Sequence, residues 1–365
     1  MKKILGLALL MVPVSSLYTM EMTITSTLLR NIESNLSSWV YIKKHFVSSD
    51  GEKIAVIDNT GVISVWDRTG NVIDRNLGQR INEETSLTFN QDATKLSIIT
   101  SQGTEECDIL NPDALKAIKD ALNYCTIEKK VQSLDKTKIA TLTNTGMISV
   151  WDGTGKLIEK VIAQANTKVT SLAFNQDATK LSVTTKQGTE EYDILNPDAL
   201  KAIKDVLNYC LIEKKVQSLD KTKIAILANT GIISVWDGTG KVIDRKIAQR
   251  NAPVTSLAFN QDATKLSIGT KEGTEECDIL NPDALKAINE AMSGSIIEKK
   301  IQSADKTKIA ILTNAGNISV WDGISGKAIN RFVAIDRYTV DSMTFTADGK
   351  AVITSSKNKK EEYRI

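Results

Sequence analysis

The sequence predicts an all-β protein built from a fourfold repeat. Close variants of "ISVWDGTGKLI" begin at Ile63, Ile148, Ile233 and Ile318, at equal spacing along the chain. Each period contains short β-rich segments, such as those around Ile139 and Ile148, separated by turns that carry Asp or Gly. These turns are typical of β-hairpins. No segment is long enough for a parallel repeat of alternating strands and helices.

Each period divides into two related units of about 42 residues, which we call A and B. The A unit reads "IEKKVQSLDKTKIATLTNTGMISVWDGTGKLIEKVI" at residues 127–162, and the B unit begins "VTSLAFNQDATKLSVTTKQGTEEYDIL" at Val169. Both show three short apolar segments joined by turns. In the A unit the third segment ends in Trp-Asp, and the residues from Asp152 to Lys156 turn the chain into a fourth strand.

In the B unit, a helix is predicted where the fourth strand would stand. Asn111 is a preferred N-cap, Pro112 fits the first helical position, and "DALKAIKDAL" follows with its apolar residues at helical spacing. The same segment recurs from Asn196 and from Asn281. An unpaired strand edge invites aggregation unless it is covered. We therefore expect the apolar stripe Leu115, Ile118 and Leu122 to pack down on the open edge of its own sheet; the alternative is that the helices present exposed faces to a partner.

These motifs resemble the WD-repeat family over residues 41–365, because the Asp-containing turn, the "TG" turn and the "VWD" ending follow in the family's order. The resemblance implies an eight-bladed β-propeller of four double blades, with seven blades and one irregular unit as the alternative. It assigns a structural role to Trp66, Trp151, Trp236 and Trp321. The Gly-His pair usual in the family is absent, and His45 is the single histidine.

The amino terminus predicts export. Residues 1–20, "MKKILGLALLMVPVSSLYTM", place two lysines before a short apolar run and small residues, as in a cleaved signal peptide. Residues 21–40 predict a helical segment, because a shift by one full repeat aligns Ile32 with Ala117 of the B-unit helix. The last B unit lacks its own helix, so we expect this segment to close the ring.

Composition excludes few partners but disfavours nucleic acid. The chain has 365 residues, and 46 Lys and Arg against 44 Asp and Glu give a net charge of +2. We expect a monomer with no membrane span after signal cleavage, located in a bacterial periplasm, on the cell surface or in the medium. The four cysteines recur unevenly among the repeats, so free thiols are expected rather than disulfides.

The sequence offers no catalytic constellation, metal site or cofactor site. A Ser-His-Asp arrangement would need His45, which stands where the next repeat has Lys130. The hairpin aspartates are too dispersed for calcium, and we interpret them as turn formers.

Lysine pairs at the start of each A unit are the candidate binding residues. On the innermost strands they would surround the channel and attract an anionic ligand or an acidic partner. The alternative is that they neutralise the glutamate pairs of the B units, at Glu105, Glu190, Glu275 and Glu361. The candidate lysines are Lys44, Lys129, Lys130, Lys214, Lys215, Lys299 and Lys300.

The predicted function is an exported, non-enzymatic scaffold that binds a protein or peptide through one face of the propeller. One alternative is a propeller hydrolase or lyase acting on a sugar or lactone, which would use residues that are not repeated. These are His45, Arg250, Arg331 and Arg337. A structural surface protein is the other alternative.

Overall fold

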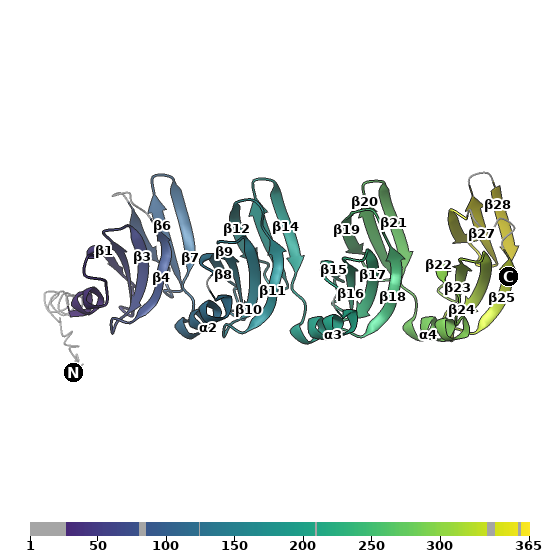
Figure 1. Cartoon of the computed structure of the whole chain (residues 1–365), viewed down its shortest axis with the longest axis horizontal. Coiled ribbons are helices and arrows are strands. Elements are labelled where there is room, and N and C mark those ends of the chain that lie inside the picture. The colour runs from purple at the N-terminus through teal and green to yellow at the C-terminus, as the bar shows by residue number, and fades with distance from the viewer. Residues whose placement is uncertain (1–26, 80–84, 124, 209, 334–339, 357–358) are drawn as a thin grey trace, which may run out of the picture. The chain divides into compact units, whose positions relative to one another are not determined.

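The computed structural model describes residues 27–79, 85–123, 125–208, 210–333, 340–356 and 359–365 (Figure 1). The predicted signal peptide lies outside these residues. In the described chain the all-β class is confirmed, since four four-stranded and four three-stranded antiparallel sheets follow one another. The chain divides into two compact units, residues 1–191 and 192–365, each containing two A sheets.

The four A sheets each have four strands in sequential order. They are β1 Ile42–Val47, β2 Lys53–Asp58, β3 Val62–Asp67 and β4 Val72–Gln79; β8 Ile127–Gln132, β9 Lys138–Thr143, β10 Met147–Asp152 and β11 Leu157–Gln164; β15 Ile212–Gln217, β16 Lys223–Ala228, β17 Ile232–Asp237 and β18 Val242–Gln249; and β22 Ile297–Gln302, β23 Lys308–Thr313, β24 Asn317–Asp322 and β25 Ala328–Val333.

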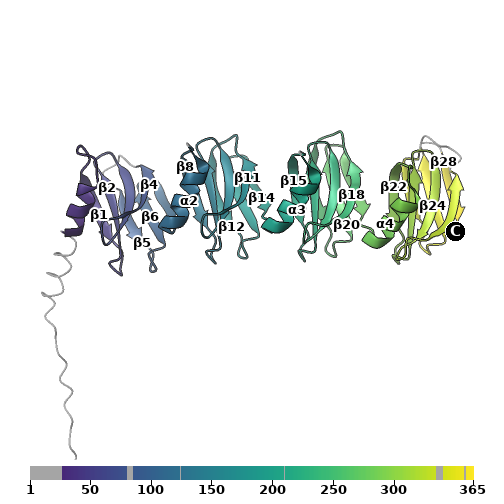
Figure 2. The same ribbon diagram turned by 60° about the horizontal axis from the view of Figure 1, so that its bottom comes forward.

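The four B sheets each have three strands, and a helix follows the first three of them (Figures 1 and 2). The strands are β5 Ser86–Phe89, β6 Lys95–Thr100 and β7 Gly103–Asp108; β12 Val169–Phe174, β13 Lys180–Thr185 and β14 Gly188–Asp193; β19 Val254–Phe259, β20 Lys265–Thr270 and β21 Gly273–Asp278; and β26 Ser342–Phe345, β27 Ala351–Ser356 and β28 Lys359–Arg364. The helices are α2 Pro112–Leu122, α3 Pro197–Leu207 and α4 Pro282–Ala291.

Each helix begins at the predicted cap. The Asn111 side chain accepts hydrogen bonds from the backbone N–H groups of Asp113 and Ala114, and Pro112 occupies the first turn. Asn196 and Asn281 cap α3 and α4 in the same way. These caps accept hydrogen bonds from backbone N–H groups of the first helical turn, which have no acceptor within the helix.

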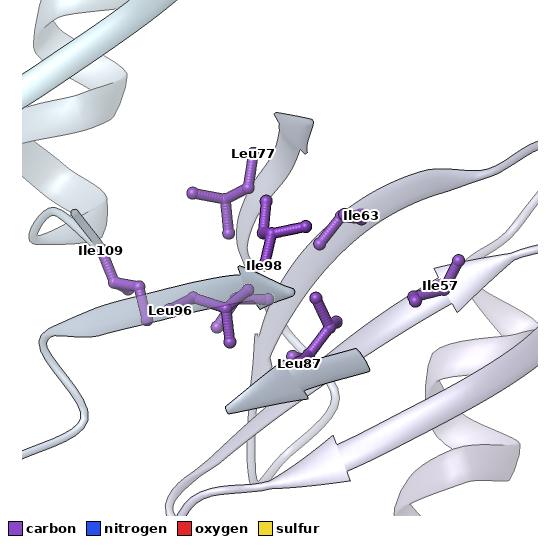
Figure 3. Close-up of a cluster of buried hydrophobic side chains, with 9 residues drawn as sticks. Ile57, Ile63, Leu77, Leu87, Leu96, Ile98 and Ile109 are labelled. Atoms are coloured by element: carbon purple, nitrogen blue, oxygen red, sulfur yellow. The ribbon is translucent and has the colours of Figure 1, made fainter. Parts of the chain in front are cut away.

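An A sheet and the B sheet that follows it share an apolar core. In the first pair, Ile57 and Ile63 of the A sheet meet Leu87, Leu96 and Ile98 of the B sheet (Figure 3). Leu77 on β4 and Ile109 after β7 complete the cluster. The third and fourth A–B pairs have equivalent clusters. Burial of these side chains provides the main stabilisation of the pair.

The opposite face of each A sheet is covered by the helix that precedes it. Leu115, Ile118 and Leu122 of α2 pack with Ile139 and Trp151 of the second A sheet. Helices α3 and α4 pack in the same way on Trp236 and Trp321. The expectation that the helical stripe packs on its own sheet's open edge was therefore wrong. The broad tryptophan face offers more apolar surface than a strand edge can.

The glycine of the "DGTG" turn is required by this helix packing. Gly155 has a φ of +87°, and a Cβ atom there would lie 2.5 Å from the carbonyl oxygen of Ala114 in α2. Gly240 and Gly326 approach α3 and α4 equally closely. Only glycine accommodates both the positive φ and the contact.

The amino-terminal segment is the equivalent of these helices. Residues 27–34 are helical, and Leu28 and Ile32 pack on Ile54, Val56 and Trp66 of the first A sheet. The shift by one repeat predicted a helical segment over residues 21–40, and the structure describes a helix at residues 27–34 and places it on the A sheet that follows it.

The A and B sheets differ in how many faces they bury. The central A strands are buried almost throughout, as in β9 and β16. The central B strands alternate, because Leu181 and Val183 of β13 are buried whereas Ser182 and Thr184 are only half-buried. The third strands, such as β14, are mainly exposed.

Replacing Ile32 by alanine should lower the free energy of unfolding by about 2 to 5 kcal/mol, because the side chain is fully buried against the first A sheet. Arg30→Ala is the matched control on the exposed side of the helix, and should change stability by less than about 0.5 kcal/mol. Urea unfolding followed by tryptophan fluorescence measures both. Equal stability of the two variants would show that the segment does not dock.

Candidate functional site

The two lysines of each pair cannot converge on one ligand. Adjacent residues in a strand point to opposite faces of the sheet. Lys129 lies opposite Leu142 in the register of β8 and β9, and Lys130 lies opposite Thr141, whose hydroxyl accepts a hydrogen bond from Trp151. The second lysine of the pair therefore faces the preceding repeat on the tryptophan side.

The second lysine forms a buried ion pair with the preceding A sheet. The Lys130 Nζ lies 2.6 Å from Oδ2 of Asp74 on β4, with 9% and 3% of the two side chains exposed. Lys119 of α2 lies 3.6 Å from the other carboxylate oxygen of Asp74. Lys300 pairs with Asp244 of β18 in the same way. These lysines already neutralise a carboxylate, which disfavours their use as anion receptors.

The first lysine of the pair has other partners. Lys44 and Lys299 donate to the backbone carbonyls of Thr85 and Asp341, at distances of 3.2 and 2.6 Å. Lys129 lies 3.5 Å from Glu105 of β7. For this one pair, the predicted neutralisation by a B-unit glutamate is confirmed. Lys214 is exposed and Lys215 half-buried.

A second polar contact joins each B sheet to the next A sheet. The Asp108 carboxylate at the end of β7 accepts a hydrogen bond of 2.7 Å from the backbone N–H of Gln132 in β8. Asp193 and Asp278 do the same for Gln217 and Gln302. Burial raises the pKa of Asp108, and the hydrogen bond from Gln132 opposes that rise.

A groove of about 1280 Å³ opens at the junction between the first B sheet and the second A and B sheets. Residues 104–108 of β7 line it together with residues of β8 and β12. The Lys130–Asp74 ion pair lies among its lining residues, with Leu115 and Lys119 of α2. The groove combines backbone edges, small side chains and charges of both signs.

Sequence reasoning found the lysines and missed their buried partners. Asp74, Glu159 and Asp244 occupy the same position of the fourth strand, and all three are buried. Asp108, Asp193 and Asp278 recur in the same manner at the end of the third B strand. The available sequence signal for these buried partners was a carboxylate that recurs at one position of successive repeats, next to apolar strand residues.

The hairpin aspartates bind their own turns. Asp135 accepts a hydrogen bond of 2.6 Å from the Ser133 hydroxyl and one of 3.0 Å from the Thr137 N–H. These bonds, that of Ser133 first, lower the pKa of Asp135 to about 2. Asp220 and Asp305 behave alike. Among the described residues, no group of three or more His, Cys, Asp or Glu side chains could hold a metal ion.

The residues that are not repeated have structural neighbours. His45 is exposed on β1, Arg250 forms an ion pair with Glu275, and the Arg331 guanidinium lies 5.8 Å from the centre of the Trp321 ring. Arg337 lies outside the described residues. The four cysteines, all of them described, are half-buried and form no disulfide, and burial raises the pKa of Cys277.

Comparisons with known proteins leave the family open. No family model and no curated protein matches the chain. Among solved structures, it is similar to the computationally designed Ika8 protein, with 20% identity, 89% of this chain and 96% of that chain covered, and a TM-score of 0.25. It is also similar to the Cps50 (Swd1) β-propeller domain of Myceliophteria thermophila, with 12% identity, coverage of 89% and 97%, and a TM-score of 0.25.

The C-terminal WD40 domain of Sif2 gives 14% identity, coverage of 90% and 83%, and a TM-score of 0.22. TM-scores this low carry no argument about how the sheets are arranged. Within the described part of the chain, no helix has the length and apolar character that crossing a bilayer requires.

Replacing Lys130 by alanine should lower the free energy of unfolding by about 3 kcal/mol, because the buried Asp74 carboxylate then loses its partner at 2.6 Å and keeps the more distant and more exposed Lys119. The double variant Lys130→Met with Asp74→Leu should recover most of that loss. Lys129→Ala, which breaks the more exposed pair with Glu105, is the control and should cost less than about 1 kcal/mol. A double variant no more stable than Lys130→Ala would refute the ion-pair assignment.

The turn aspartates should make stability depend on pH in the acid range. The folded-state pKa of Asp135 is about 2, below the ordinary value of 3.8. Its contribution is therefore complete above pH 3.8 and is lost as the pH falls through about 2. Carboxyl NMR titration should show this pKa, and Ser133→Ala should raise it. Thr154→Ala, next to Asp152, should leave the Asp135 titration unchanged.

Proposed function

We propose that this chain is an exported, non-enzymatic scaffold that binds a polypeptide partner. The observation that carries the proposal is the groove of about 1280 Å³ lined by residues of β7, β8 and β12, three strands that each stand at the end of their sheet's strand order. Export is proposed from the signal-like residues 1–20, and places the protein in a periplasm, on a cell surface or in the medium.

We extend the proposal to the arrangement of the sheets. The eight sheets are proposed to be the blades of a closed ring resembling WD-repeat propellers, with seven blades as the alternative. The fourfold repetition supports this, as does the placement of α2, which covers Trp151 and lies beside β4, at the outer end of the blades.

The closing junction of such a ring would differ from the internal ones. His45 stands at the position that Lys130 holds in the next repeat. Asn330 lies opposite Val320 in the register of β24 and β25, as Asp74 lies opposite Val65 in that of β3 and β4. Asn330 therefore stands where the internal junctions have the paired carboxylate. Arg364 takes the place of Asp108. The two recurring polar contacts would therefore be absent from the closing junction.

Small-angle X-ray scattering of residues 21–365 tests the ring. A closed, compact chain of this size has a radius of gyration of about 20 Å. A value well above that, with an elongated distance distribution, would refute closure while leaving the binding proposal standing.

Affinity capture tests the scaffold. The mature protein, residues 21–365, immobilised and exposed to extracts of its own cell envelope, should retain a stoichiometric protein partner at moderate salt. A parallel assay with simple glycosides and lactones should show no turnover. Turnover without a partner would favour the hydrolase or lyase alternative, and absence of both would favour a purely structural protein.

A further inference from the structure

Three strand edges that have no partner strand line one groove. In the described sheets, β7, β8 and β12 each stand at the end of their strand order, so each pairs on one side only. All three supply residues to the groove. In the second unit, β21, β22 and β26 hold the same positions in their sheets. An unpaired edge offers a row of backbone donors and acceptors.

The hydrogen bonds at neighbouring residues show which backbone N–H and C=O groups point out from these strand edges. The backbone N–H groups of Ser133 and Asn175 donate to the backbone carbonyl oxygens of Lys138 and Lys180, in the neighbouring strand of the same sheet. Because the direction alternates along an antiparallel strand, the backbone groups of Phe174 and Leu172 point out from β12. On β8, the outward N–H of Gln132 is already occupied by the Asp108 carboxylate.

The side chains along β12 leave room beside its edge. Ser171 and Ala173 are small, exposed and part of the groove lining. The charged lining residues carry both signs and neutralise one another, since Lys129 pairs with Glu105 and Lys95 pairs with Glu106. The described lining therefore has no patch of one sign that would attract a strongly acidic or strongly basic partner.

We propose that the groove takes an extended polypeptide segment of balanced charge, which adds a strand to the open edge of β12. Only an extended main chain satisfies a row of alternating N–H and C=O groups, and this mode of recognition obtains its affinity from main-chain hydrogen bonds. The inference rests on the proposed scaffold function and specifies its site and its partner chemistry.

A phage-displayed library of random octapeptides, selected on residues 21–365, tests the site. Enriched peptides should carry both acidic and basic residues. N-methylation of alternate peptide nitrogens, in the register that faces β12, should weaken binding at least tenfold, whereas methylation in the other register should not. Failure of the library to enrich any peptide, or equal effects of the two registers, would overturn the proposal.

Variants of the protein locate the binding. Ala173→Trp fills the groove, and Ala258→Trp and Thr344→Trp change the same position of the third and fourth B sheets. The triple variant should lose at least tenfold in peptide affinity. Gln187→Trp is the control, because Gln187 is exposed in the turn between β13 and β14 and does not line the groove. All four positions are exposed, so folding should persist.

The outcome is separable from that of the scaffold proposal. If an envelope partner is captured but binds the triple variant as tightly as the native protein, strand addition at β12 is wrong and the scaffold proposal stands. If no partner is captured, the scaffold proposal fails independently of the peptide experiment.

Discussion

Burial of the tryptophan face of each A sheet is the constraint on which the rest of the structure depends. Trp66, Trp151, Trp236 and Trp321 are among the largest fully buried side chains, and each bonds its indole N–H to a hydroxyl within its own sheet. An A sheet thus needs apolar partners on both faces. The helix before it and the B sheet after it supply them, which fixes the order helix, A sheet, B sheet.

The B sheet needs only one partner, and this difference creates the candidate site. Its second face carries serine, threonine, lysine and glutamate, so water can remain between it and the next repeat. The junction is then held by the helix and by a few polar contacts, the Lys130–Asp74 ion pair among them. Buried ion pairs contribute little net stability, but they specify which partner fits. A groove remains beside the edges of β7, β8 and β12.

Most of the fold could be predicted from the sequence because its signals are local and repeated. Turn residues, the Asn111 cap and the "VWD" ending placed strands and helices, and the shift by one repeat found the amino-terminal helix. The surface covered by the helices could not be predicted, because helical periodicity identifies the apolar stripe of a helix but not the sheet against which that stripe packs. The lysines were found for the same local reason, whereas Asp74 belongs to the preceding A unit and meets Lys130 only through tertiary packing.

Two fragments of equal length test the order of the module most directly. Residues 109–278 contain two complete helix, A sheet and B sheet modules, whereas residues 126–295 lack α2, keep α3 and end on α4, which leaves Trp151 uncovered. Urea unfolding should show a cooperative transition for residues 109–278, with a free energy of unfolding at least about 2 kcal/mol above that of residues 126–295. Equal stability of the two fragments would contradict the claim that each helix belongs to the A sheet that follows it.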